Sequence, residues 1–195
     1  MKRIVIFASG SGTNAQNIIE YFKSSRDIIV DSLWSNNENA YALIRAEKLE
    51  VETFTFGKDE LYRSVDVLET LCERKVDLIV LSGFLWLLPH NLTNEFKVIN
   101  IHPALLPRYG GKGMYGDYVH AAVIRNKDKE SGISIHYVND RYDEGKIIFQ
   151  AKCSVRPGDT PQLLAEKIHQ LEYKHYPRVI EEVLLNEESG SEEEI

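Results

Sequence analysis

Short apolar segments alternate with segments of helical periodicity in the first half of the chain, and this alternation constrains the fold more than any other feature. Residues 3–8 form an apolar run typical of a strand. Apolar side chains then recur at positions 15, 18, 19 and 22, the spacing of an amphipathic helix. The pattern repeats with strands expected over 28–35, 51–55 and 77–82 and helices expected over 39–49 and about 59–72. Such alternation predicts a doubly wound α/β fold, with helices on both faces of a mostly parallel twisted sheet.

The second half of the chain is less regular. Strands are expected over 97–101, 133–138 and 146–155, and a helix over 117–126. The Pro- and Gly-rich segment 103–116 is predicted to be a loop of a length typical of functional loops. Pro161 opens a final helix, whose apolar stripe is interrupted at Pro177. In the earlier helix over about 59–72, Asp59 is the expected cap, and one apolar face is made by Leu61, Val65, Leu68 and Cys72.

The chain length is that of one domain. A chain of 195 residues can bury a sufficient core without disulfides or a structural metal, so residues 1–185 are expected to form a single domain. Residues 186–195 contain five glutamates and no basic residue, which predicts a solvated, disordered tail. Most of the net charge of −7 comes from this tail. No cluster of Lys and Arg stands out elsewhere, which argues against nucleic acid as a partner.

Membrane and secretory signals are missing from the sequence. The apolar runs are far shorter than the roughly 20 residues needed to span a bilayer, and the apolar start breaks into a glycine-rich segment. Cys72 and Cys153 lack the spacing of a disulfide framework or zinc site, so both are expected to be buried thiols in a reducing cytosol. These features predict a cytoplasmic protein without a membrane partner.

The segment Ser9-Gly-Ser-Gly-Thr-Asn14 lies between the first strand and the first helix. Its glycines permit positive φ, and the helix that follows offers free N–H groups to an anion, so the segment is typical of a phosphate cradle. It also matches a dinucleotide-binding fingerprint, but that motif requires an acid at the end of the second strand. Ser35, Asn36 and Asn37 stand there, while Asp31 falls within the strand. A tight turn that binds nothing stays as the alternative.

Polar side chains end the strand over 97–101. The two-residue period of a strand puts Asn100 and His102 on one face. An amide beside an imidazole can stabilise a tetrahedral oxyanion, although both groups can also serve only to satisfy backbone at a strand end. Asp143 lies in the polar turn before the last strand, where carboxylates usually stabilise turns. If this turn reaches the same edge, Asp143 is expected to favour protonated His102 and to relay a proton.

Three motifs in order resemble the folate-dependent formyltransferase family. They are Asn100-Ile-His-Pro-Ala-Leu-Leu-Pro107, the glycine-rich loop that ends at Asn14, and the segment from Ser134 to Gly145. The similarity extends over almost the whole chain, and the glycine-rich loop and short length point to the enzymes that formylate phosphoribosylglycinamide. The resemblance implies transfer of the formyl group of 10-formyltetrahydrofolate to the amine of 5-phosphoribosylglycinamide in purine synthesis. It implies a Rossmann-like fold and no metal.

The resemblance also implies residue roles. Asn100, His102 and Asp143 are the implied catalytic residues. The ribonucleotide is expected to contact Gly12, Thr13, Asn14 and Glu172. The folate pocket is expected to be lined by Phe84, Leu85, Trp86, Leu87, Leu88, Val138, Asn139 and Asp140. His169 lies one turn before Glu172, where relatives have other polar residues, and a phosphate contact there is left open.

The sequence departs from the family in two places. Trp86 stands where many relatives have an arginine, and the loop over 109–116 is longer and richer in glycine. Recognition of the folate tail or of the glycine moiety is therefore expected to differ. Rival interpretations are methionyl-tRNA formyltransferase, formyltetrahydrofolate hydrolase and a non-catalytic nucleotide-binding module. The first two usually carry a further domain that 195 residues do not accommodate, and the third gives Asn100, His102 and Asp143 no task. The sequence leaves open whether the protein is a monomer or a homodimer.

Overall fold

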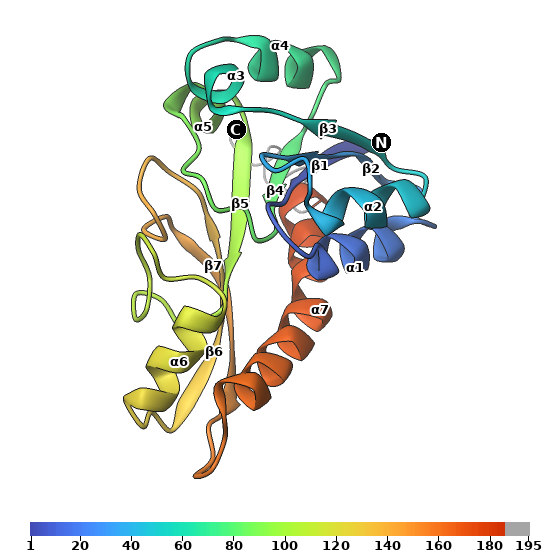
Figure 1. Cartoon of the computed structure of the whole chain (residues 1–195). Helices are drawn as coiled ribbons and strands as arrows, with labels where there is room; N and C mark the ends of the chain where they lie inside the picture. Colours follow the sequence, from blue (N-terminus) through green and yellow to red (C-terminus); the bar gives the residue numbers. More distant parts are fainter. Residues whose placement is uncertain (186–195) are drawn as a thin grey trace, which may run out of the picture.

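The computed structural model describes residues 1–185, and the expected acidic tail over 186–195 lies outside them. A seven-stranded sheet has the order β3-β2-β1-β4-β5-β6-β7 (Figure 1). The strands are β1 (Lys2–Phe7), β2 (Ile28–Ser35), β3 (Glu52–Thr55), β4 (Leu78–Leu81), β5 (Lys97–His102), β6 (Glu130–Tyr137) and β7 (Ile147–Ser154). Strands β1 to β5 are parallel to one another, whereas β6 pairs antiparallel with β5 and β7 pairs antiparallel with β6. This arrangement confirms the predicted mostly parallel α/β fold.

Helices cover both faces of the sheet. They are α1 (Thr13–Phe22), α2 (Tyr41–Lys48), α3 (Lys58–Tyr62), α4 (Asp66–Glu73), α5 (His90–Glu95), α6 (Asp117–Arg125) and α7 (Pro161–Leu185). One apolar core lies between the sheet and α1, α2, α6 and α7, and a second lies under α3, α4 and α5. In β1, Ile4 and Ile6 face the first core, while Val5 and Phe7 face the second. This burial on both sides explains why β1 is a continuous apolar run.

The helix expected over about 59–72 is two helices, α3 and α4. Ser64 interrupts it, because its Oγ donates to the carbonyl of Glu60 at 3.0 Å and accepts the N–H of Asp66 at 3.2 Å. These local bonds replace the helical pattern at the break. Gly57, rather than Asp59, precedes α3, and Val65 is 50% exposed. The face buried against the core is made by Leu61, Val67 and Leu71.

The final helix continues through Pro177, where the sequence predicted an interruption of its apolar stripe, and Pro177 itself is buried. Proline has no N–H, so the carbonyl of Tyr173 loses its helical partner. Asn17 on α1 fills that role, since its Nδ2 donates to the Tyr173 carbonyl at 3.0 Å. A side chain from a neighbouring helix thus compensates for the proline.

Two smaller expectations are also corrected. Cys72 is exposed, because Val67 and Leu71 make the buried face of α4, and Cys153 is only partly buried. The short helix α5 was not predicted, since only Leu92 of its six residues is buried. The segment 103–116 has neither helix nor strand, as predicted. Within residues 1–185, the structure has no helix that is both long and apolar enough to cross a membrane.

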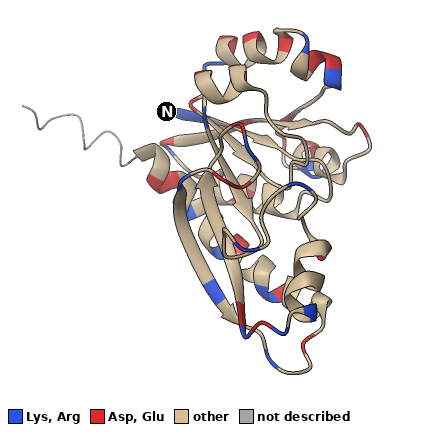
Figure 2. Cartoon of the chain, turned by 90° about the vertical axis from the view of Figure 1, so that its left-hand side faces the viewer, with Lys and Arg blue, Asp and Glu red and all other residues tan. Residues whose placement is uncertain are grey.

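Charged side chains are mixed over the surface of the described chain. Basic residues are scattered among acidic ones in Figure 2, without a continuous basic stripe in that view. Within residues 1–185, no group of three or more His, Cys, Asp and Glu side chains is arranged to hold a metal ion.

Candidate active site

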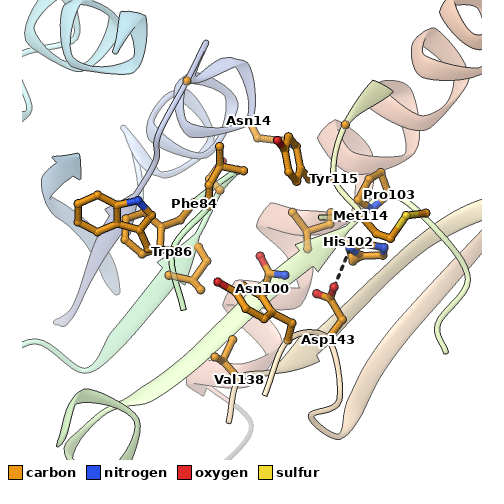
Figure 3. A pocket seen from close by; sticks show the side chains of 18 of the residues that line it. Asn14, Phe84, Trp86, Asn100, His102, Pro103, Met114, Tyr115, Val138 and Asp143 are labelled. Carbon is orange, nitrogen blue, oxygen red and sulfur yellow. Dashed lines mark ion pairs between the residues drawn. The ribbon is translucent and has the colours of Figure 1, made fainter. Parts of the chain in front are cut away.

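A cavity of about 600 Å³ lies beyond the carboxyl ends of β1, β4 and β5 (Figure 3). This is the edge at which parallel α/β sheets bind ligands. Its walls include the glycine-rich loop from Gly10 to Asn14, the segment from Leu81 to Leu88, the end of β5 and the loop from Gly111 to Gly116. The cavity therefore joins segments that are far apart in the sequence.

The glycine-rich loop requires glycine at position 12. Gly12 has φ of 72°, and a Cβ on it would lie 2.5 Å from the Cα of Ala42 on α2. Both the left-handed backbone and the close approach of α2 exclude a side chain here. Among the described residues, no side chain caps the N-terminus of α1, so its first N–H groups stay available to an anion. Thr13 and Asn14, the first residues of α1, line the cavity beside Gly12.

Ser9 ties the glycine-rich loop to the segment expected to bind folate. Its Oγ donates to Oδ1 of Asn36 at 2.6 Å and accepts the N–H of Leu85 at 3.0 Å. The N–H of Ser9 also donates to the carbonyl of Gly83 at 3.1 Å. One buried hydroxyl thus fixes the spacing between two walls of the cavity.

The three implied catalytic residues meet at one wall. Asn100 and His102 share a face of β5, and Asp143 folds back over them from the turn between β6 and β7. His102 Nδ1 lies 3.5 Å from Asp143 Oδ2, the contact drawn in Figure 3. His102 Nε2 donates to the carbonyl of Tyr109 at 2.7 Å. The structure therefore brings together the three residues that the sequence predicted to share one edge.

Asp143 is held in position from several sides. The backbone N–H of Gly111 donates to its Oδ2 at 2.9 Å, and His136 Nε2 lies 3.6 Å from its Oδ1. Its backbone is left-handed, with φ of 57°. Burial raises the pKa of Asp143, but His136, His102 and the Gly111 N–H outweigh burial, so the pKa lies below its ordinary value. Asp143 is thus an anion at neutral pH.

Burial acts against the protonation that was expected for His102. Burial lowers the pKa of His102 below its ordinary value, although Asp143 and the Tyr109 carbonyl both favour the charged form. This lowering opposes the protonated form of His102 that the sequence led us to expect. The direction of the Asp143 effect is as expected, but removal from water is the larger effect. With Nε2–H given to Tyr109, Nδ1 is the nitrogen that can accept a proton.

Glu172 and Asn14 form the opposite end of the cavity. Asn14 Nδ2 donates to Glu172 Oε2 at 2.9 Å, and Glu172 is only 6% exposed. Burial raises the pKa of Glu172 to about 7, and the bond from Asn14 only partly offsets it. Within the described chain, three buried polar atoms of cavity-lining residues have no partner: Asn14 Oδ1, Ser82 Oγ and His120 Nδ1. Unpartnered buried polar atoms are uncommon, and in a cavity they fit a polar ligand.

Two histidines of this wall were not assigned by the sequence. His136 contacts Asn100 and Asp143, and His120 on α6 is buried with a pKa lowered to about 4, chiefly by burial. His136 lies inside the motif from Ser134 to Gly145, but only the pairing of β6 with β5 shows its partners. No local signal distinguishes His120 from a core histidine on an amphipathic helix.

The segment expected to bind folate is mostly in place. Phe84, Leu85, Trp86, Leu87, Leu88 and Val138 line the cavity. Asn139 and Asp140, which were expected to line it too, are not among its lining residues; Arg141 and Tyr142 line it instead. The reason is the turn, which carries residues 141–143 back over the cavity. The ring of Trp86 lies 6.1 Å from that of Tyr62, and the Lys58 ammonium lies 5.7 Å from the indole centre.

Comparisons with known proteins identify the family. A family model described as formyl transferase matches residues 2–180. The chain is 35% identical to phosphoribosylglycinamide formyltransferase of Haemophilus influenzae, covering 92% of this chain and 86% of that protein. The Bacillus subtilis enzyme of the same name is 33% identical, with 94% and 95% covered. The chain spans 64% of the length of a chloroplastic relative from Arabidopsis thaliana, at 35% identity.

Solved structures give the same result. The crystal structure of phosphoribosylglycinamide formyltransferase from Bacillus halodurans has a TM-score of 0.83 and 32% identity, covering 94% of this chain and 96% of that chain. Glycinamide ribonucleotide transformylase 1 from Symbiobacterium toebii also has a TM-score of 0.83, at 31% identity, with 92% and 86% covered. With a family match over most of its length and relatives of this similarity, the chain belongs to the formyl transferase family.

Proposed function

We propose that this protein transfers the formyl group of 10-formyltetrahydrofolate to the primary amine of 5-phosphoribosylglycinamide, a step of purine synthesis. The relatives named for this activity support the proposal. The observation that carries it is the cavity, where an amide, an imidazole and a carboxylate meet between a phosphate-type loop and an apolar wall. A cytoplasmic location, a single domain over 1–185 and a monomeric or homodimeric state stay predictions from the sequence.

The ribonucleotide occupies the half of the cavity beside α1. Its phosphate binds the free N–H groups at the N-terminus of α1, next to Gly12, Thr13 and Asn14. Glu172 and the unpartnered Oδ1 of Asn14 then accept hydrogen bonds from ribose hydroxyl groups. This placement directs the glycinamide amine toward Asn100 and His102.

The folate occupies the half between the segment Phe84–Leu88 and Val138. Backbone groups of this segment bind the polar edge of the pterin, and its apolar side chains cover the ring. The side chains of Phe84 and Trp86 lie along this wall in Figure 3, across the cavity from His102. The formyl group then lies between the two halves.

The chemistry follows from the groups at the junction. The amine nitrogen attacks the formyl carbon, a new C–N bond forms, and the formyl oxygen gains negative charge. Asn100 donates an N–H to this oxygen, and preorganised donors of this kind lower the barrier by roughly 3–4 kcal/mol. His102 takes a proton from the amine at Nδ1, and the Asp143 carboxylate stabilises the imidazolium that results. The bond from carbon to N10 then breaks, and His102 returns the proton to N10, which yields tetrahydrofolate.

A direct assay tests the proposal. Purified protein is mixed with 5-phosphoribosylglycinamide and 10-formyltetrahydrofolate, and the absorbance of the tetrahydrofolate product is followed. We expect turnover that requires the ribonucleotide and falls at least 10²-fold, roughly 2.7 kcal/mol, in Asn100→Ala. Asn94→Ala, at an exposed asparagine of α5, is the matched control and should leave turnover unchanged.

Three results would redirect the assignment. Release of formate in the absence of the amine would indicate a hydrolase. Formylation of methionyl-tRNA in its place would indicate the tRNA enzyme. Binding of the ribonucleotide without any turnover would indicate a nucleotide-binding module.

A further inference from the structure

His136 is a buried histidine that touches two of the three proposed catalytic residues. It lies directly opposite Asn100 in the antiparallel pairing of β5 with β6 and is only 2% exposed. Its Nε2 lies 3.2 Å from Asn100 Nδ2 and 3.6 Å from Asp143 Oδ1. On its other side, the pairing with β7 shifts register between Ile135 and His136, and such irregularities redirect side chains.

The partners of His136 determine where its proton lies. Nδ1 lies 2.8 Å from the carbonyl of Tyr137, and a carbonyl can only accept, so Nδ1 carries a hydrogen. Nε2 faces the NH₂ group of Asn100, which can only donate, so Nε2 is unprotonated and accepts. The Asp143 carboxylate, 3.6 Å from Nε2, lies beyond hydrogen-bond distance, so the two hydrogen-bonded contacts together fit the neutral imidazole with its proton on Nδ1.

The Asn100 amide lies in the orientation that this tautomer favours. One N–H of Asn100 is given to His136, which leaves the second N–H of the same nitrogen for another acceptor. The reversed amide would place Oδ1 against the lone pair of Nε2, which is repulsive. A histidine protonated on both nitrogens would instead attract Oδ1 and offer its Nε2–H to Asp143. The neutral form thus selects one of the two amide orientations.

We propose that His136 is a positioning residue for formyl transfer, whose neutral Nδ1–H tautomer orients the Asn100 amide so that its second N–H faces the formyl oxygen. This inference rests on the proposed function, because it supposes that Asn100 stabilises the oxyanion. The Tyr137 carbonyl fixes the tautomer, and β-sheet register fixes the distance to Asn100. His136 itself does not contact the reacting atoms.

The first test uses the wild-type protein and no enzymatic reaction. The ¹⁵N chemical shifts of the His136 ring, recorded on protein labelled at histidine, distinguish a protonated nitrogen from an unprotonated one. We expect a protonated Nδ1 and an unprotonated Nε2 at neutral pH. A proton on Nε2 would overturn the proposal.

The second test compares two amide substitutions. His136→Gln extends its amide to the place of Nε2 and can accept from Asn100, whereas His136→Asn reaches only the place of Nδ1. We expect kcat to fall about tenfold or more in His136→Asn, the effect of one lost hydrogen bond, and to stay within about threefold in His136→Gln. KM for both substrates should change little in either variant. Equal loss in both variants, or none in His136→Asn, would contradict the proposal.

The side-chain NH₂ signals of Asn100 give a readout that a merely structural role would not move. These signals are assigned by their loss in Asn100→Asp. They should shift in His136→Asn and stay near their wild-type positions in His136→Gln. If His136→Asn does not fold, the tautomer and the Gln variant still decide the matter.

The two proposals can fail separately. Absence of formyl transfer by the wild type, with the expected tautomer and NH₂ shifts, would reject the proposed function and retain the orientation of Asn100 by His136. Normal formyl transfer by the wild type, together with a proton on Nε2 of His136, would retain the proposed function and reject the orientation of Asn100 by His136.

Discussion

Glu172 is predicted to make the stability of this protein fall as the pH rises. Its carboxyl is almost fully buried, and burial raises its pKa in the folded chain to about 7. In the unfolded chain the carboxyl has its usual pKa of 4.5. Between pH 4.5 and 7, Glu172 is therefore protonated in the folded chain and ionised in the unfolded chain. Between these two values the unfolded state binds fewer protons, so the free energy of unfolding decreases with pH. At about 1.4 kcal/mol for each pH unit, the total loss is about 3 kcal/mol between pH 4.5 and 7. Above pH 7 no further loss from this group is expected.

Replacement of Glu172 by glutamine removes this dependence. The glutamine side chain keeps the shape and can still accept from Asn14, but it does not titrate. Urea unfolding of wild type and Glu172→Gln at several pH values from 4.5 to 8 gives the difference between their free energies of unfolding. We expect this difference to move by about 3 kcal/mol in favour of the variant as the pH rises to 7 and then to level off.

A matched control separates this effect from other titrations. Glu166 is exposed on the same helix, and Glu166→Gln should follow the wild type at every pH. Parallel curves for wild type and Glu172→Gln would refute the reasoning, since they would show that Glu172 is ionised in the folded state as in the unfolded one.

Three further predictions concern the cavity. Asp143→Asn should lower the pKa of His102 further and reduce kcat by roughly 10² or more, with little change in ligand affinity. NMR titration of His102 and steady-state kinetics on the same variant measure these effects. An unchanged pKa of His102 together with normal turnover would return Asp143 to the role of a turn residue. Gly12→Ala should weaken binding of the ribonucleotide far more than that of folate in calorimetry, because a Cβ there strains the loop and collides with α2; equal loss of both would indicate general misfolding. Ser9→Ala should weaken the binding of both ligands, because it removes the hydrogen bonds that hold the Leu85 N–H and Asn36 to the glycine-rich loop. Ser9→Thr keeps the hydroxyl and should restore part of the lost affinity.

Local features of the sequence predicted most of the fold. The strand over Ile28–Ser35 and the start of the last helix at Pro161 agree with the structure, because apolar periodicity and proline act over a few residues. The break at Ser64 was also local, but it depended on a hydroxyl that competes for backbone bonds within an otherwise helical pattern. Continuity through Pro177 depended on Asn17, a residue 156 positions from the carbonyl it satisfies.

The site shows the same division between local and distant causes. Gly12 was identified from its loop, and Asn100 and His102 from the period of one strand. The lowered pKa of His102 could not be predicted, because it follows from burial in the folded site. The contacts of His136 likewise required the register of an antiparallel pair, which the sequence does not specify residue by residue.

The long sequence separation across the cavity has a consequence for the order of folding. The bond from Asn14 to Glu172 joins residues 158 positions apart, and Tyr176 donates to the carbonyl of Leu81 across 95 positions. Contacts of such separation carry a large loop-closure cost and form late in folding. During synthesis, the glycine-rich loop emerges long before α7, so this end of the cavity closes only after nearly all of the described chain has been made. Ligands that bind this site therefore stabilise the finished fold and not its early intermediates.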